Sequence, residues 1–429
     1  MKKGLKIVER SEALKHFEEE YINPYVREMK KNIEKYIDDH RKELTEAFVE
    51  NFRTLCRKIK EMQKEGRKGK IAYITYSFNI HNLQKESRDY VVQAYGNEWF
   101  LEEGEECKIS YNVGWLYDFL DDFYGKLFEI SKKYMGNINA SDMDQVWKKG
   151  VIHCDVKLLN FTKRAIKEAV KTEEFKALDK EEVLEIRLGQ EKGYNEIIYK
   201  MDTRVKDSKK MKEWLESGEK NYSYSVLQNL DLSGGNYKGI TCHNADFSGS
   251  NLSDSNFEGA SLIESVFVKS IINGVNFYRS SLPETDFSDT VLENSNFQEA
   301  GLRLAILARA QFMNCNLNNA KLYSSDLSYC TFKNSFLTNT KFYETNLENA
   351  DLSGNNFMGA VFFRTKLIGA DLSNADLTGT EFINIDFTTF KFDNAKFANN
   401  KVKEIKVYEK DLYRLNLSEE QLEEVTVVK

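Results

Sequence analysis

Between residues 232 and 397, a large side chain occupies every fifth position of the chain without interruption. Leu or Phe fills 31 of these 34 positions, and the other three hold Tyr237, Cys242 and Ile272. A spacing of five fits neither the 3.6-residue period of an α-helix nor the two-residue period of a continuous strand. The segment is therefore a repeat array, and its period determines the architecture that we expect.

The residues around each large side chain divide the repeat into a short strand and a corner. Two positions before the large residue, the side chain is usually small, as in Ala245, Ser250 and Ala260. Two positions after it, Gly or Asn fills 20 of the 34 positions, and both residues tolerate the positive φ of a tight turn. Each unit of five therefore predicts three extended residues, with the small and large side chains pointing inward, followed by a turn.

A column of asparagines predicts how many sides the coil has. Asn precedes the large residue eight times, and six of these asparagines are separated by multiples of 20 residues. The six are Asn236, Asn256, Asn276, Asn296, Asn316 and Asn356. Stacking of their side chains as an amide ladder explains the column, and 20 residues correspond to four sides of five residues.

The repeats 245–249, 350–354 and 370–374 (ADFSG, ADLSG and ADLSN) resemble the A-(D/N)-L-x-x signature of the pentapeptide-repeat family. The resemblance implies a right-handed quadrilateral β-helix, which we place over residues 221–417. The fold is therefore expected to be mostly β. A helix-rich α+β domain (1–220) precedes the β-helix, and a C-terminal capping helix and tail (418–429) close it.

The N-terminal part of the chain carries helical patterns. Apolar residues recur three or four positions apart over residues 10–66, which predicts helices. Asn23 precedes Pro24 within this stretch, and we interpret Asn23 as the cap of a second helix. Helices are also predicted for residues 113–133 and 141–172, the latter with Ser141 as its cap and a break near Gly150.

Strand-like segments lie between these helices. Residues 71–78 are rich in Ile, Tyr and Thr, and residues 182–201 predict a hairpin. Residues 89–95 and 98–101 flank a Gly-Asn pair, which predicts a second hairpin. This mixture of elements indicates an α+β domain.

Composition and charge bound the class of protein. The chain of 429 residues has a net charge of −7 and is 41% hydrophobic, and its first residues lack the apolar core of a signal peptide. We therefore expect a cytoplasmic protein without membrane association. Its six cysteines stand singly, without the spacing of a metal site, so we expect reduced thiols and neither a metal nor a cofactor.

The sequence holds no constellation that predicts catalysis. We find no Gly-rich phosphate loop, histidine cluster or nucleophile motif. His153, Cys154 and Asp155 invite a catalytic interpretation, but neighbours on one helix do not face each other. We therefore predict no enzyme, and an enzyme or toxin within residues 1–220 stays open as an alternative.

One outward column of the repeat array is apolar over several coils. It occupies the position after the large residue and is flanked by basic side chains. Its members are Tyr323, Tyr343, Phe363 and Ile383, with Lys341 and Arg364 beside them. Outward positions elsewhere are mostly Ser, Thr, Asn and Lys, so a contiguous aromatic strip predicts an interface. Docking of the chain's own N-terminal domain, or stacking for stability alone, remains an alternative.

Two functions follow from these patterns. The first is a non-enzymatic, protein-binding scaffold or adaptor. The family resemblance implies the second, a DNA-mimicking protein that binds DNA gyrase or topoisomerase IV and protects it from quinolones or toxins. Duplex DNA carries about one charge per 1.7 Å, whereas this array has 18 acidic residues against 12 basic ones. The scaffold is therefore favoured, and we expect no direct binding of nucleic acid.

The C-terminal end of the array bears on assembly. The resemblance implies a homodimer formed through the C-terminal coils. Ser418 and Gln421 form a capping-box pattern that predicts a short helix closing the array. The apolar tail with Val425, Val427 and Val428 offers another route for joining two copies end to end.

Overall fold

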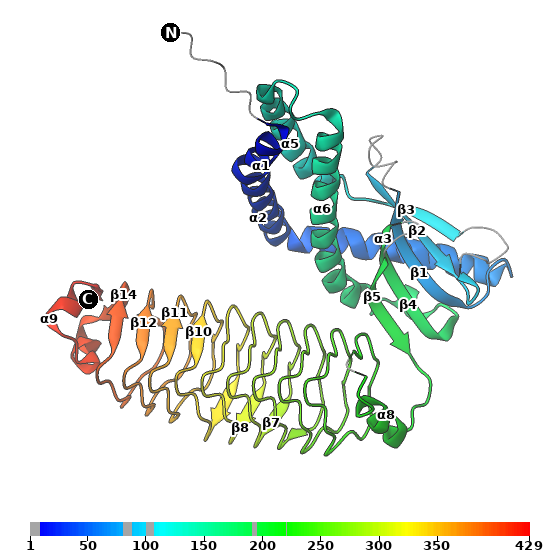
Figure 1. The fold of residues 1–429 in the computed structure, drawn as a ribbon. Coiled ribbons are helices and arrows are strands. Elements are labelled where there is room, and N and C mark those ends of the chain that lie inside the picture. The colour runs from blue at the N-terminus through cyan, green and yellow to red at the C-terminus, as the bar shows by residue number, and fades with distance from the viewer. Residues whose placement is uncertain (1–8, 80–87, 100–106, 191–194, 220) are drawn as a thin grey trace, which may run out of the picture. The chain divides into compact units, whose positions relative to one another are not determined.

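Two units, residues 1–204 and 205–429, make up the chain. The computed structural model describes residues 9–79, 88–99, 107–190, 195–219 and 221–429. The first unit combines helices with a five-stranded sheet, and the second is a solenoid of short strands, as Figure 1 shows.

The chain begins with three helices in close succession. They are α1 (Arg10–Phe17), α2 (Asn23–Asp39) and α3 (Arg41–Lys64), with a π-helical turn (Glu18–Ile22) between the first two. The predicted helices are confirmed here, but the cap at Asn23 is wrong. Asn23 has helical angles, φ −63° and ψ −43°, because the π-helical turn runs directly into α2 and leaves no free helix start for Asn23 to cap.

Two further helices pack against each other, α5 (Gly114–Ser131) and α6 (Ala140–Ala169). The predicted cap at Ser141 is wrong by two residues: Oδ1 of Asn139 accepts from the N–H of Asp142 at 3.1 Å, and Asp142 accepts in return at 2.8 Å. The predicted break is also wrong. Gly150 lies inside α6, where a Cβ atom would lie 2.3 Å from Cδ1 of Leu120 in α5, so the glycine serves close helix packing.

The sheet of the first unit has the strand order β3-β2-β1-β4-β5. Its strands are β1 (Ile71–Phe78), β2 (Asp89–Tyr95), β3 (Cys107–Asn112), β4 (Lys180–Gln190) and β5 (Asn195–Asp202). Strands β1 and β4 are parallel, and the other neighbours are antiparallel. Two short helical segments complete the unit, Lys132–Tyr134 and α7 (Glu173–Lys176).

One of the two predicted hairpins is confirmed, in β4 and β5. The other is wrong, because β2 pairs with β3 rather than with residues 98–101. Trp99 has φ +53° and packs on Tyr73 at 4.2 Å between ring centroids, so the chain turns at Trp99 instead of continuing as a strand. Residues 100 and 101 lie outside the described part.

The second unit is a right-handed, four-sided β-helix of about eight turns. Residues 20 apart form parallel bridges, for example Asn236 with Asn256 and Asn256 with Asn276. The backbone has positive φ at every position ending in 4 or 9 from Tyr224 to Glu404, except at Thr389. The predicted coil and its corners are therefore confirmed. At the exception, a 3-10 turn (Phe387–Thr389) replaces the corner.

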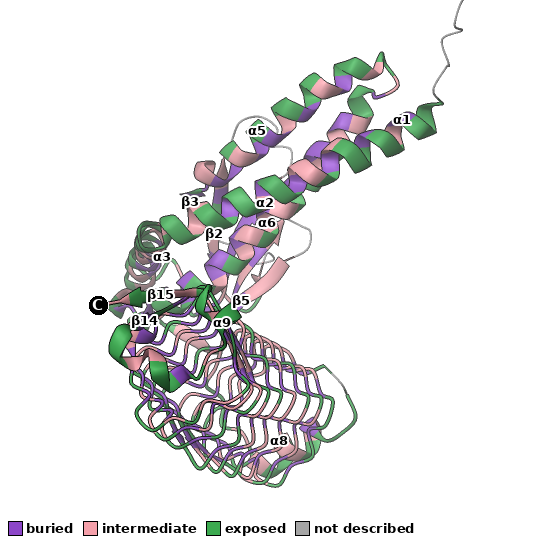
Figure 2. Cartoon of the chain, turned by 90° about the vertical axis from the view of Figure 1, so that its left-hand side faces the viewer, coloured by how far each residue is buried: buried purple, intermediate pink, exposed green. Residues whose placement is uncertain are grey.

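Regular strands line two walls of the solenoid. One wall carries β6 (Ile272–Asn273), β7 (Val291–Glu293), β8 (Gln311–Met313) and β9 (Thr331–Lys333). The other carries β10 (Lys341–Tyr343), β11 (Val361–Phe363), β12 (Glu381–Ile383) and β13 (Lys401–Lys403). Figure 2 shows that buried and exposed residues recur at the same places in successive coils.

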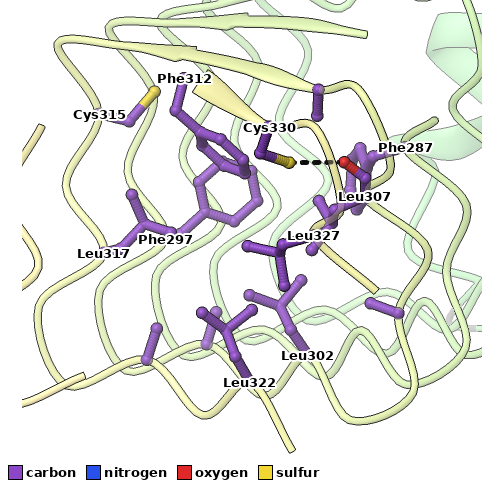
Figure 3. Packing of buried hydrophobic residues seen from close by; sticks show 14 of the residues in the cluster. Phe287, Phe297, Leu302, Leu307, Phe312, Cys315, Leu317, Leu322, Leu327 and Cys330 are labelled. Carbon is purple, nitrogen blue, oxygen red and sulfur yellow. Dashed lines mark hydrogen bonds between the residues drawn. The ribbon is translucent and has the colours of Figure 1, made fainter. Parts of the chain in front are cut away.

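Large and small inward side chains fill the coil in different ways. Phe267 stacks on Phe247 at 5.0 Å and on Phe287 at 4.7 Å, with nearly parallel rings. Small polar residues donate to the carbonyl of the large residue in the preceding coil. Figure 3 shows one case, in which Sγ of Cys330 donates to the carbonyl of Leu307 at 2.8 Å. Most inward Ser, Thr and Cys side chains are therefore tolerated because they find an acceptor, whereas the buried hydroxyl of Ser325 has none.

The asparagine column forms the predicted ladder over three steps. Side-chain amides join Asn256, Asn276 and Asn296 each to the asparagine one coil earlier, at 3.4, 3.0 and 3.1 Å. The ladder then ends, because Asn316 donates to Gln298 and Phe336 takes the next place in the column.

Short helices stand at both ends of the solenoid. At its start, α8 (Ser208–Leu215) contributes Leu215 to the buried core. At its end, β14 (Ile405–Tyr408) and a 3-10 segment (Glu409–Leu415) precede α9 (Glu419–Leu422) and β15 (Val425–Val428). The capping box of the terminal helix is confirmed, since Ser418 and Gln421 exchange hydrogen bonds at 2.9 and 3.3 Å. Strand β15 pairs in parallel with β14.

Two successive coils near this end carry opposite charges on all four walls. The acids are Asp371, Asp376, Glu381 and Asp386, and the lysines one coil later are Lys391, Lys396, Lys401 and Lys406. Three of the four pairs are ion pairs, at 3.2, 2.7 and 3.1 Å. In the fourth, burial acts to raise the pKa of Asp371, but hydrogen bonds from Ser373 and the charge of Lys391 lower it overall. These charge rings favour one stacking register of the coils.

Candidate functional site

The apolar column of the sequence lies on the wall built by β10–β13. Tyr343, Phe363 and Ile383 occupy the same register position in three neighbouring strands. Tyr323 lies one coil earlier, since Lys321 bridges to Lys341. The four residues Tyr323, Tyr343, Phe363 and Ile383, here called the aromatic strip, therefore form one line along the solenoid axis.

The rings of the aromatic strip pack on one another. The centroids of Tyr323 and Tyr343 lie 4.9 Å apart with an interplanar angle of 14°, and those of Tyr343 and Phe363 lie 5.6 Å apart. All four side chains are intermediate in exposure. The strip thus presents ring edges and methyl groups to its surroundings, while the facing sides of the Tyr323 and Tyr343 rings stack on each other.

Backbone hydrogen bonds between neighbouring coils hold the strands beneath the strip in register. The N–H of Ser324 donates to the carbonyl of Tyr343 at 2.8 Å, and the N–H of Glu344 donates to that of Phe363 at 2.7 Å. On the inner side, Phe342 and Phe362 stack at 4.9 Å in the core. The strip is consequently held on a wall that needs no ordering before contact with a partner.

The predicted flanking residues are brought together with the strip. The guanidinium of Arg364 lies 5.1 Å from the ring centroid of Phe363 and 3.8 Å from the carboxylate of Glu344. Lys341 begins the strand that ends in Tyr343. Cation–π contact at Phe363 fixes the position of Arg364 at the edge of the strip.

Sequence reasoning missed two apolar neighbours of the strip. Val361 stands in the other outward column of the same wall, between Lys341 and Glu381 in register. Leu304 occupies the corner whose N–H donates to the carbonyl of Tyr323 at 2.8 Å. The signal for Val361 was present, because the spacing of 20 residues applies to every column of the repeat and not only to the aromatic one.

Other exposed apolar side chains of the solenoid are isolated or paired. Ile271 neighbours Val291 on one wall, and Phe336 lies with Met358 on another; Phe336 is 56% exposed and Met358 43%. Within the described residues, no other outward-facing column holds four consecutive apolar side chains on one wall. Continuity, rather than exposure of single residues, distinguishes the aromatic strip.

The contacts of His153, Cys154 and Asp155 indicate a structural role for these residues rather than a catalytic one. Burial raises the pKa of Cys154 and lowers that of His153, so the thiolate nucleophile that catalysis requires is disfavoured. Asp155 accepts hydrogen bonds from the hydroxyls of Tyr90 at 3.0 Å and Tyr117 at 3.1 Å. Burial raises the pKa of Asp155 to about 7 against the effect of these bonds. The carboxyl joins α6 to β2 and α5.

Comparisons with known families match the solenoid. The family described as pentapeptide repeat region matches residues 305–382, and the family described as pentapeptide repeats (8 copies) matches 225–262, 240–277 and 270–309. These matches all lie outside the N-terminal unit. No curated protein matches the chain.

Solved structures of repeat proteins resemble the solenoid as well. One is HetL from the cyanobacterium Nostoc sp. strain PCC 7120, a pentapeptide repeat protein involved in heterocyst differentiation regulation. It is 19% identical to this chain with a TM-score of 0.26, and the match covers 47% of this chain and 97% of HetL. QnrB1, a plasmid-mediated fluoroquinolone resistance protein, is 18% identical with a TM-score of 0.22, covering 48% of this chain and 99% of that protein. Rfr23 from the cyanobacterium Cyanothece 51142 is 23% identical with a TM-score of 0.18, covering 37% and 88%. These likenesses concern the fold alone.

Helices that span a bilayer were sought in the described part of the chain. None of its helices combines the length and the apolar composition that a membrane crossing requires.

Proposed function

Residues 225–382 of this chain form a pentapeptide-repeat region, and we propose that the protein is a non-enzymatic scaffold that binds another protein through the aromatic strip. The observation that carries the proposal is the run of four apolar side chains in register on one wall. Aromatic side chains and arginine are the residues most enriched at the energetic centres of interfaces.

The rigidity of the wall supports binding by the strip. A partner that docks on flexible side chains loses part of the interaction energy, about 0.5–1.5 kcal/mol for each side chain that becomes ordered. Here Tyr343 already packs against Tyr323 and Phe363, and Arg364 is held by Phe363 and Glu344. The strip therefore enters a complex with little further loss of conformational entropy.

DNA mimicry toward gyrase or topoisomerase IV receives less support as a second candidate. A protein that imitates DNA needs carboxylates that remain unneutralised along one face. Nine acids between residues 221 and 417 have a cation within ion-pair distance: Glu258, Asp289, Glu299, Glu344, Asp376, Glu381, Asp386, Asp393 and Asp411. Internal pairing thus reduces the negative potential that such a partner would recognise.

Assembly and compartment are further parts of the proposal. The six cysteines are buried free thiols, which supports a reducing compartment such as the cytoplasm. A homodimer through the C-terminal coils would use the end where β15 pairs with β14 and where Val427 is 45% exposed. Light scattering of the full chain tests this part. We expect a dimer that Val427→Asp converts to monomer, and a monomeric wild type contradicts it.

Capture of partners by the immobilised full chain tests the scaffold. The chain is incubated with an extract of the cells that produce it, and bound proteins are compared among three forms. We expect Tyr343→Ala with Phe363→Ala to lose proteins that the wild type retains. The matched control, Phe336→Ala with Met358→Ala, removes exposed apolar side chains from another wall and should retain them. Identical sets of bound proteins for all three forms would refute the proposal.

A further inference from the structure

The wall that carries the aromatic strip has an excess of positive charge. Between residues 301 and 404, its cations are Arg303, Lys321, Lys341, Arg364, Lys401 and Lys403, and its acids are Glu344, Glu381 and Glu404. Arg364 and Lys401 pair with Glu344 and Glu381. Within the described part of the chain, the other four cations form no ion pair, although the repeat array as a whole is acidic.

Two of the unpaired cations lie at the ends of the strip, and the other two lie along one edge. Arg303 precedes Tyr323 in the same outward column, and Lys403 follows Ile383 in register. Lys321 and Lys341 line one edge of the two tyrosines. An apolar line with cations at its ends and along one edge fits a partner that presents apolar side chains flanked by carboxylates.

The distance between neighbouring rings of the strip indicates which backbone conformation of a partner fits it. Ring centroids along the strip are 4.9 and 5.6 Å apart, close to the α-helical pitch of about 5.4 Å. A helix parallel to the solenoid axis therefore places about one side chain of its apolar stripe over each coil. Addition of an extended strand is disfavoured, because the N–H groups of Ser324, Glu344 and Arg364 already bond to the next coil.

Proteins that bind single-stranded nucleic acid also use aromatic and basic residues, but the geometry of the strip disfavours nucleic acid as its ligand. Bases stack on open ring faces. Tyr323 and Tyr343 cover each other's faces with an angle of 14° between planes, and Arg364 lies over Phe363. The strip offers ring edges, which pack well against aliphatic side chains.

We propose that the strip binds an acidic amphipathic α-helix of a partner protein, lying along the solenoid axis. The inference rests on the proposed scaffold function and specifies the chemistry of the partner. The helix places Leu-type side chains over Tyr323, Tyr343, Phe363 and Ile383. Its Asp and Glu residues contact Arg303 at one end, Lys321 and Lys341 along one edge, and Lys403 at the other end. Five coil spacings of about 4.8 Å separate these ends, which corresponds to about 16 helical residues.

Designed peptides test the inference with the full-length chain. The probe is a fluorescein-labelled helical peptide of about 16 residues, with Leu at four positions spaced 4-3-4 and Glu on both flanks. Two controls carry Lys in place of Glu or the same residues in scrambled order. Fluorescence anisotropy is expected to show at least tenfold tighter binding of the Glu peptide than of either control.

Charge reversal on the chain makes the test specific. The double variant Lys321→Glu with Lys341→Glu should bind the Glu peptide at least tenfold more weakly than the wild type and the Lys peptide more tightly. Structural damage would not produce such a reversal of preference. Equal binding of the Glu and Lys peptides would overturn the inference. So would an unlabelled single-stranded oligonucleotide that displaces the Glu peptide from the wild type.

The outcome separates the inference from the function on which it rests. If the Tyr343→Ala and Phe363→Ala variant loses captured proteins while the Glu peptide fails to bind, the acidic helix is wrong and the scaffold stands. If capture is the same for all forms, the scaffold is refuted and the acidic helix with it.

Discussion

In the solenoid, residues that stack on one another are 20 apart in the chain, whereas in the N-terminal unit Tyr73 of β1 lies opposite Glu185 of β4. Each coil therefore contacts only its neighbours, and the stability of the solenoid is approximately a sum over adjacent coils. The sheet and helices of the first unit form one buried core that depends on pairings distant in sequence. The two units should therefore respond differently to the same chemical change.

The largest expected effect comes from truncation of a buried phenylalanine in each unit. Phe277 stacks between Phe257 at 5.5 Å and Phe297 at 4.8 Å, and Phe48 of α3 stacks on Tyr76 at 5.3 Å. Either change to Ala should lower the free energy of unfolding by about 3–5 kcal/mol. Hydrogen exchange should show loss of protection confined to neighbouring coils for Phe277→Ala, but spread over the whole sheet for Phe48→Ala. Uniform loss over all coils would contradict the contrast.

Two glycines, one in α5 and one in α6, test the contrast between the units further. Close packing of two helices occurs in the first unit and has no equivalent in the repeat. Gly150→Ala places a Cβ near Leu120 and should destabilise the first unit by about 1–3 kcal/mol. Gly125→Ala meets nothing within 4 Å and should stabilise it by about 0.5–1 kcal/mol. Tryptophan fluorescence during denaturation, recorded in a Trp214→Phe background, reports on this unit, which holds Trp99, Trp115 and Trp147, because Trp214 is the one tryptophan of the second unit. Equal effects of the two substitutions would show that α5 and α6 do not pack closely at Gly150.

Asp155 provides a pH dependence that belongs to the first unit. Since burial raises its pKa to about 7 from the ordinary value of 3.8, the folded unit binds this proton more tightly than the unfolded chain. Its contribution to stability is complete below about pH 4 and is lost as the pH rises toward 7, with a slope of at most about 1.4 kcal/mol per pH unit. Asp155→Asn should flatten the dependence of the tryptophan-monitored midpoint on pH. A midpoint with the same pH dependence in both forms would assign the titration elsewhere.

The smallest effect is expected at the charge rings of the solenoid. Lys406→Glu places a carboxylate opposite Asp386 and should destabilise the terminal coils by less than about 1 kcal/mol. The double variant with Asp386→Lys should recover only the charge pairing, because it also removes the hydrogen bonds that Asp386 accepts from Thr388. The loss caused by Lys406→Glu should diminish in 1 M salt. Lys333→Glu is the control, because Lys333 forms no ion pair in the described part of the chain. Hydrogen exchange near β14 measures the effect, and an equal effect of the control would contradict it.

How much could be predicted differs between the units for a physical reason. In the repeat, the position of Phe363 within its unit of five determines its wall, its neighbours and its outward direction. The same numbering by itself places Tyr323, Tyr343 and Ile383 in one line. In the first unit, the turn at Trp99 depends on a contact with Tyr73, and the continuity of α6 through Gly150 depends on packing against Leu120. Such contacts leave no local pattern.

The sequence by itself determined the four-sided coil, its positive-φ corners and the stacking of the aromatic strip, because a short repeat converts chain distance directly into spatial distance. The tertiary structure alone decided which charges around the strip are paired and how the hydroxyls of Tyr90 and Tyr117 donate to Asp155. Those features depend on side chains that meet across walls, strands and helices, and their geometry exists only once the chain has folded.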